Sequence, residues 1–169
     1  MEVLLDRDPY DNRCLSMAAD TYYWQGAALE MLAEETKPSF DRAIQLQRQI
    51  CNKSKTVNTR GMLLKILARA GEVDEATKLA DEMADESDQM MSCGYAACGY
   101  ALLSEHLETG SPEHTQAVTK AVDLATKLVR HGYRDFEALR TTDLDFKPLQ
   151  TNADYLAMLD QEETATTEK

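Results

Sequence analysis

One short helical pattern occurs three times in this chain and constrains its fold more than any other feature. The segments FDRAIQLQRQI, VDEATKLADEM and TQAVTKAVDLA align on one alanine, which is Ala43, Ala76 or Ala117. Successive alanines lie 33 and then 41 residues apart, which is close to the length of a helix-turn-helix repeat with one insertion. A small residue at the same place in each helix lets a partner helix approach closely. We therefore expect the three alanines to be buried where paired helices cross.

Each of these helices follows another segment whose apolar residues recur every three or four positions, as on the buried face of a helix. Asp11 or Asn12 can cap the first helix, Gly71 can end the third, and Ser111-Pro112 can start the sixth. The pattern predicts six helices in three pairs, over about residues 12–35, 38–50, 56–70, 72–87, 88–108 and 112–130.

The composition supports a fold made only of helices. Four prolines and seven glycines in 169 residues are too few for the many turns of an all-β domain of this size. Leu, Ala, Glu and Lys, all good helix formers, are abundant. The chain is predicted to be all-α.

The net charge and the cysteines limit which ligands and which cellular compartment the sequence favours. A net charge of −12 disfavours binding to nucleic acid or to an anionic membrane, because phosphates would be repelled. The chain has no apolar run long enough to span a bilayer, and its acidic N-terminus does not resemble a secretory signal. The four cysteines lack metal-ligand spacing and are expected to be free thiols. We expect a cytoplasmic protein.

The unit NTRGMLLKILARAGEVDEATKLADEMADES resembles a tetratricopeptide repeat. Leu63, Leu64 and Leu67 occupy the packing positions of its first helix, and Gly71 occupies the turn. The small residues of the second helix are Ala76 and Ala80, followed by the closing apolar Met83. The proline that the family often carries after this helix is absent. The resemblance implies a right-handed solenoid of helical hairpins, with three helix pairs over residues 11–131 after a lead-in of residues 1–10.

The stretch HGYRDFEALRTTDLDFKPLQTNADYLAML, residues 131–159, resembles the segment that closes tetratricopeptide arrays in some large bacterial serine/threonine kinases and related proteins. Such a segment covers the apolar face that the last repeat would otherwise leave exposed. The resemblance implies a capping segment over residues 132–160, a disordered tail over 161–169, and a place at the C-terminal end of a larger bacterial signalling protein. The residues expected to form the cover are Leu139, Leu144, Phe146, Leu149, Tyr155, Leu156 and Leu159.

No arrangement of residues in the sequence indicates catalysis, a metal or a cofactor. His106, His114 and His131 fit no metal-binding motif, and no glycine-rich phosphate loop is present. We expect a protein that is not an enzyme and that needs no cofactor. Trp24, Met90 and Met91 could serve a binding surface, but at helical spacing they are more typical of the core.

One charge pattern points to a binding site. From Arg42 through Ala70 the chain has seven basic residues and no acidic one, so this stretch carries +7 while the remainder carries −19. Asn58, Met62, Lys65 and Arg69 are four, three and four residues apart, which aligns them on one side of the third helix. The tetratricopeptide resemblance implies that this side lines a groove. The alternative is that these cations neutralise acidic helices beside them, notably residues 72–88.

Two functions remain open on the sequence alone. The first is a non-catalytic protein-interaction module that binds a protein or peptide partner, which would be acidic if it docks on Lys65 and Arg69. The alternative is a self-association or spacer domain whose exposed helix faces form a homodimer.

Overall fold

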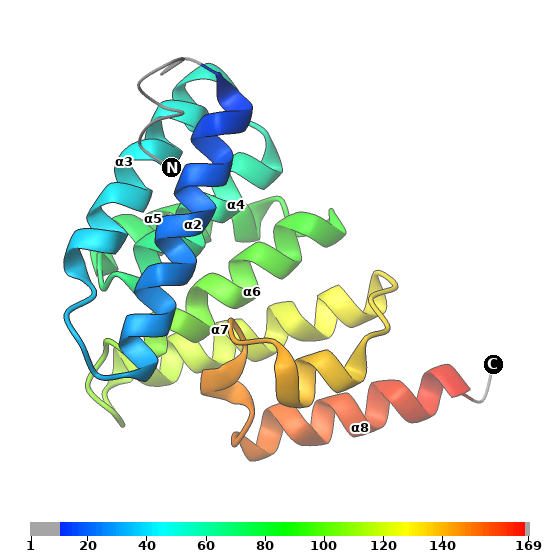
Figure 1. Ribbon diagram of the computed structural model, residues 1–169. Coiled ribbons are helices and arrows are strands. Elements are labelled where there is room, and N and C mark those ends of the chain that lie inside the picture. Colours follow the sequence, from blue (N-terminus) through cyan, green and yellow to red (C-terminus); the bar gives the residue numbers. More distant parts are fainter. Residues whose placement is uncertain (1–10, 168–169) are drawn as a thin grey trace.

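Every regular element of the chain that the computed structural model describes, residues 11–167, is a helix (Figure 1). The predicted lead-in, residues 1–10, lies outside the described part. The all-α prediction is confirmed. In chain order the elements are α2 (Asn12–Met31), α3 (Lys37–Lys53), α4 (Val57–Arg69), α5 (Val73–Asp85), α6 (Met90–Ser104), α7 (Pro112–Arg130), the π-helical η1 (Ala138–Thr142), the 3-10 helix η2 (Lys147–Leu149) and α8 (Ala153–Thr167).

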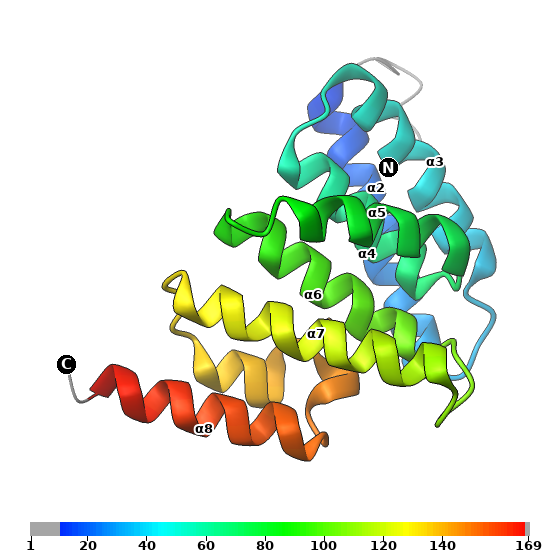
Figure 2. The same ribbon diagram turned by 180° about the vertical axis from the view of Figure 1, so that it is seen from behind.

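The helices pack in pairs that are adjacent in sequence. α2 lies against α3, α4 against α5, and α6 against α7, while α4 and α5 both contact α6. Figures 1 and 2 show the pairs following one another from the N-terminal end to α8 in chain order. This arrangement makes α4 and α6 the inner helices of the domain, each packed between preceding and following elements.

The helix ends confirm the predicted start and stop signals. The Asp11 carboxylate caps α2 by accepting from the Arg13 backbone N–H, and Ser111 caps α7 in the same way through His114. Thr56 and Thr59 form a reciprocal capping box at the start of α4. Gly71 follows α4 with a φ of 77°, a left-handed conformation that side chains rarely adopt. Two helices end earlier than predicted. α2 ends at Met31, where the prediction was about residue 35, and α6 ends at Ser104, where the prediction was about residue 108.

The three aligned alanines are buried, as predicted. Ala43 and Ala76 have no exposed surface, and Ala117 is 6% exposed. They lie in α3, α5 and α7, the second helix of each pair. The predicted burial of the three alanines is therefore confirmed.

Two glycines allow α4 and α6 to approach closely. A Cβ at Gly61 would lie 2.1 Å from the Tyr95 ring, and one at Gly99 would lie 2.7 Å from the Leu64 side chain. Real Cβ atoms do not come so near, so any larger residue at either position would push the two helices apart.

The C-terminal segment packs onto the helix pairs as a cover. η2 contacts α6 and α8 contacts α7, and Figure 2 shows α8 alongside α7 at the end of the stack. The cover includes two parallel stacked rings, Phe146 and Tyr155, whose centroids are 6.1 Å apart. Five of the seven predicted covering residues are buried: Leu139, Phe146, Leu149, Tyr155 and Leu159.

The other two covering residues differ from the prediction. Leu144 is 38% exposed and Leu156 is only partly buried. Leu144 stands between two aspartates whose polar contacts fix the turn, and its backbone carbonyl, rather than its side chain, faces the interior.

The prediction of a disordered tail over residues 161–169 is wrong for residues 161–167, because α8 continues through them. Acidic side chains hold this part of the helix to the domain, since Glu162 pairs with Arg130 and Glu163 pairs with Arg140. Residues 168–169 lie outside the described part.

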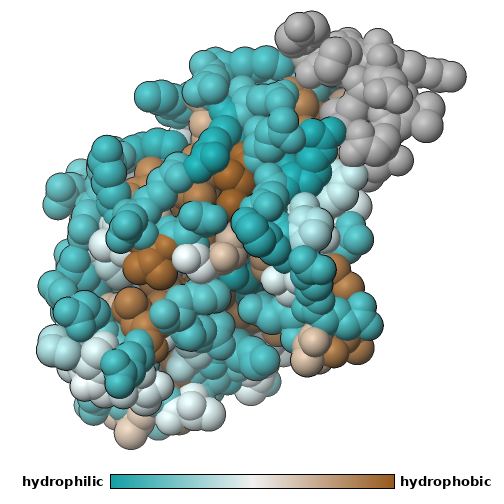
Figure 3. All heavy atoms as spheres, turned by 90° about the vertical axis from the view of Figure 1, so that its left-hand side faces the viewer, coloured by the Kyte–Doolittle hydropathy of each residue, from teal (hydrophilic) through white to brown (hydrophobic). Residues whose placement is uncertain are grey.

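Three predicted core residues are on the surface. Trp24 is 53% exposed, Met90 is 40% exposed and Met91 is 45% exposed. On α2 the neighbouring Tyr23, and not Trp24, takes the buried position. Figure 3 shows the left-hand side of Figure 1, where the surface is mostly hydrophilic with smaller hydrophobic patches between.

Candidate functional site

The four predicted site residues lie along α4 but in different environments. Asn58 is exposed at the start of the helix and Met62 is partly buried. The Lys65 side chain is 15% exposed and the Arg69 side chain is 8% exposed. The structure therefore brings Lys65 and Arg69 together in the interior, and leaves Asn58 apart from them.

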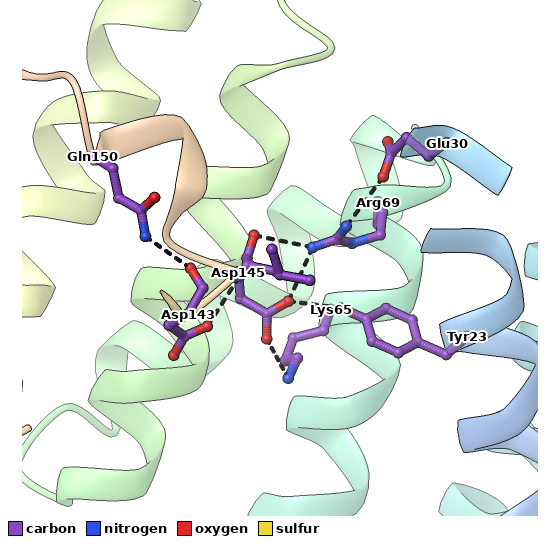
Figure 4. A network of polar contacts seen from close by, with 8 residues as sticks. Tyr23, Glu30, Lys65, Arg69, Asp143, Asp145 and Gln150 are labelled. Atoms are coloured by element: carbon purple, nitrogen blue, oxygen red, sulfur yellow. Dashed lines mark hydrogen bonds and ion pairs between the residues drawn. The ribbon is translucent and has the colours of Figure 1, made fainter. Parts of the chain in front are cut away.

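Asp145 is the partner of both buried cations (Figure 4). Its carboxylate forms an ion pair with the Lys65 ammonium and another with Arg69, at 3.1 Å from Nη2 to Oδ1. The same Arg69 nitrogen donates to the Leu144 carbonyl oxygen at 3.2 Å. An acidic turn of the C-terminal segment thus occupies the side of α4 that carries Lys65 and Arg69, which we call the basic strip.

Helix α2 completes this network. The Tyr23 hydroxyl donates to Asp145 Oδ1 at 2.7 Å, and Glu30 accepts from Arg69 Nη1 at 3.1 Å. The Lys65 and Arg69 cations also lie 5.7 and 5.5 Å from the centroid of the Tyr23 ring, within the range of a cation–π interaction. Three segments far apart in sequence therefore meet at a single carboxylate.

The opposite charges in this network favour each other's ionised forms. Burial alone would raise the pKa of Asp145, but Lys65, with help from Tyr23 and Arg69, lowers it below its usual value. Burial would lower the pKa of Lys65, and Asp145 reverses this and raises it. Both groups are therefore charged at neutral pH, and each is stable in the interior only because the other is present.

The sequence pointed to half of this arrangement. Lys65 and Arg69 stood out as a basic pair, and Asp145 belongs to the closing segment, but no sequence motif linked the two. Tyr23 carried no distinguishing signal. The opposite charges of the two segments were the one available clue to their contact.

The rest of the basic stretch supports the alternative interpretation. Arg48 pairs with Glu75, and Arg60 makes two hydrogen bonds to Glu86. Both acids lie in the 72–88 stretch that the cations were alternatively expected to neutralise. Arg48 thus links α3 to α5, across two neighbouring helix pairs, and Arg60 links α4 to the end of α5, within one pair.

A hollow lies directly beside the network. It has a volume of about 230 Å³ and opens between α4, α6, the end of α7 and the C-terminal segment. We call it the α4–α6 hollow. It is lined by Lys65, Met90, Met91, Gly94, Tyr95, Cys98, Leu128, Tyr133, Asp143, Asp145 and Phe146.

The cysteine in the hollow is poorly suited to chemistry. Burial raises the pKa of the Cys98 thiol well above its ordinary value, so the reactive thiolate is disfavoured. All four cysteines are free thiols, as predicted. Across residues 11–167, no three or more His, Cys, Asp or Glu side chains gather in a way that could hold a metal ion.

Comparisons with known proteins identify no relative of this chain: no protein-family model, no curated protein and no solved structure matches it. Within the described part of the chain, no helix combines the length and the apolar character needed to cross a membrane.

Proposed function

We propose that this protein is a non-catalytic protein-interaction module that binds its partner at the α4–α6 hollow. The observation that carries the proposal is the exposure of Met90 and Met91, at 40% and 45%, at the edge of a concave and largely apolar site. Flexible methionine side chains adapt to the shape of a bound chain, and their apolar surface gains free energy when a partner covers it.

The proposal includes a tetratricopeptide-like architecture. Helix pairs in sequence order and the buried Ala43, Ala76 and Ala117 support it. In such an array the first helices of successive pairs, here α4 and α6, face the bound partner. The resemblance of the closing segment further suggests that the module serves a larger bacterial signalling protein.

The site differs from the one that the sequence suggested. An acidic peptide docking on Lys65 and Arg69 would have to displace Asp145, which already binds both cations in the interior. The hollow beside them needs no such displacement, so we place the partner there.

A selection from a random peptide library displayed on phage tests the proposal. We expect peptides that bind the immobilised protein, and that bind the double variant Met90→Glu/Met91→Glu at least tenfold more weakly. Met17→Glu is the matched control, because Met17 is also half exposed but lies on α2, outside the hollow. A selection that yields no binder, or binders that tolerate the double variant, would contradict the proposal.

The second candidate function, self-association, has its own supporting observation. Met17, Trp24 and Met31 are 50%, 53% and 71% exposed and follow one another at seven-residue intervals along α2. Two copies of such a stripe can pair antiparallel about a two-fold axis at Trp24, because the stripe is then its own complement. Light scattering after size-exclusion chromatography tests this: a dimer that Trp24→Glu converts to a monomer would support self-association, and a wild-type monomer would exclude it.

A further inference from the structure

The α4–α6 hollow carries an unbalanced negative charge. Its charged lining residues are Lys65, Asp143 and Asp145. Lys65 and Asp145 neutralise each other directly. Asp143 has no ion-pair partner anywhere in residues 11–167, so its carboxylate leaves the hollow with a net charge of −1.

Asp143 is held in place with its charge only partly satisfied. Its Oδ1 accepts the backbone N–H of Asp145 at 3.0 Å, and its backbone carbonyl oxygen accepts from Gln150 Nε2 at 3.1 Å (Figure 4). Burial raises the pKa of this carboxyl group, and the Asp145 N–H together with the nearby Lys65 and Arg69 cations only partly opposes the increase. A cation arriving at the carboxylate would relieve that cost, because an opposite charge nearby favours the ionised form.

Aromatic rings make up much of the remaining wall. Tyr95, Tyr133 and Phe146 all line the hollow. Tyr95 is fixed against the backbone of Gly61, and Phe146 stacks on Tyr155, so two of the three rings are held by packing. Aromatic rings around a carboxylate attract organic cations, through their electron-rich faces and through contact with the alkyl part of the ligand.

The size of the hollow limits the ligand. A volume of about 230 Å³ is below the roughly 300–1,000 Å³ of pockets that enclose small-molecule ligands. One long side chain fits this space. The charge of the whole chain, −12, would also draw a basic segment toward it.

We infer that the α4–α6 hollow receives a single lysine or arginine side chain of a partner protein, with Asp143 as its counter-charge and Tyr95, Tyr133 and Phe146 around its alkyl chain. The inference rests on the proposed function and specifies the ligand chemistry of its site. The charge of the partner is opposite to the one suggested by the basic strip, because Asp145 already satisfies that strip.

Methyl NMR on protein labelled at the methionine methyl groups tests the inference with defined probes. The probes are Nα-acetyl-lysine methylamide and Nα-acetyl-arginine methylamide, and the uncharged control is Nα-acetyl-norleucine methylamide. We expect at least one cationic probe to shift the Met90 and Met91 signals, with an affinity at least tenfold above that of norleucine. Equal affinities for the charged and uncharged probes, or no shift with either cation, would overturn the inference.

Variants identify the counter-charge. Asp143→Asn keeps the oxygen that accepts the Asp145 N–H but removes the charge, and should weaken the cationic probe at least tenfold. Asp88→Asn is the matched control, because Asp88 is exposed just before α6 and does not line the hollow; it should change the affinity less than twofold. Equal effects of the two variants would mean that only general charge attraction acts, and would refute the assignment of Asp143.

The peptide selection separates failure of this inference from failure of the proposed function. Selected peptides that require Met90 and Met91 but contain no essential lysine or arginine would overturn the inference and leave the interaction module standing. A selection without binders would overturn the module itself.

Discussion

Asp145 is a buried acid that connects α2, α4 and the C-terminal segment. It is 6% exposed, and two cations from α4 and one hydroxyl from α2 converge on its carboxylate. Asp145→Asn should lower the free energy of unfolding at pH 7 by about 3–5 kcal/mol, because it leaves two buried cations without their shared counter-charge. Urea denaturation measures the loss.

The aspartate two residues earlier provides the matched control. Asp143 lines the hollow, has no ion-pair partner in residues 11–167, and has a pKa that folding raises, so its ionisation costs stability. Asp143→Asn should therefore leave the protein at least as stable as the wild type at pH 7. If Asp145→Asn were equally harmless, the ion pairs with Lys65 and Arg69 would contribute nothing to folding.

The pKa shifts of Asp145 and Asp143 predict that their contributions to folding stability depend on pH in opposite directions. The pKa of Asp145 is lowered by folding, so its contribution is fully present above the unfolded value of about 3.9 and is lost as pH falls through the folded pKa. The pKa of Asp143 is raised, so its ionisation costs stability as pH rises from about 3.9 through its folded pKa. The stability difference between wild type and Asp145→Asn should therefore shrink below about pH 4. A difference that stays constant from pH 7 to pH 2.5 in urea titrations would argue against an ionised Asp145.

At the scale of elements, the close contact of α4 and α6 predicts the effect of adding one methyl group. Gly61→Ala should destabilise the protein by about 1–3 kcal/mol, since its Cβ would overlap the Tyr95 ring. Gly94→Ala is the control: its Cβ would meet Leu128 at an ordinary 3.5 Å, and alanine favours a helix over glycine by about 1 kcal/mol. Thermal unfolding should rank Gly94→Ala at or above the wild type and Gly61→Ala below it, and the reverse order would contradict the packing described.

The elements also explain how far sequence reasoning could go. Periodicity and capping residues predicted the helices and the burial of Ala43, Ala76 and Ala117, because these signals are local. The exposure of Trp24 and Met91 was not predictable, since it depends on which helices are neighbours in space. The contact of Lys65 with Asp145 was not predictable for the same reason: the two residues are 80 positions apart in the sequence, and only folding of the C-terminal segment brings them together.

At the scale of the whole molecule, the C-terminal segment acts as part of the core. It buries Phe136, Leu139, Phe146, Leu149, Tyr155 and Leu159 in the same hydrophobic cluster as the helix pairs. It also supplies the counter-charge for Lys65 and Arg69. The segment thus covers the apolar interior and neutralises the basic strip. We therefore expect the helix pairs to need this segment in order to fold.

A pair of truncations tests this role. A chain ending at His131 loses the whole cover, and should bind the dye ANS and unfold without a cooperative transition, because the apolar surfaces of α6 and α7 and both buried cations become exposed. A chain ending at Asp160 loses only the last part of α8, with the Glu162–Arg130 and Glu163–Arg140 ion pairs. Both pairs are partly exposed, and surface ion pairs each contribute at most about 1 kcal/mol, so this shorter truncation should still unfold cooperatively, with a midpoint only slightly lower. Cooperative unfolding of the His131 truncation at the wild-type midpoint would mean that the helix pairs fold independently, and that the interaction of Asp145 with Lys65 and Arg69 is dispensable to the fold.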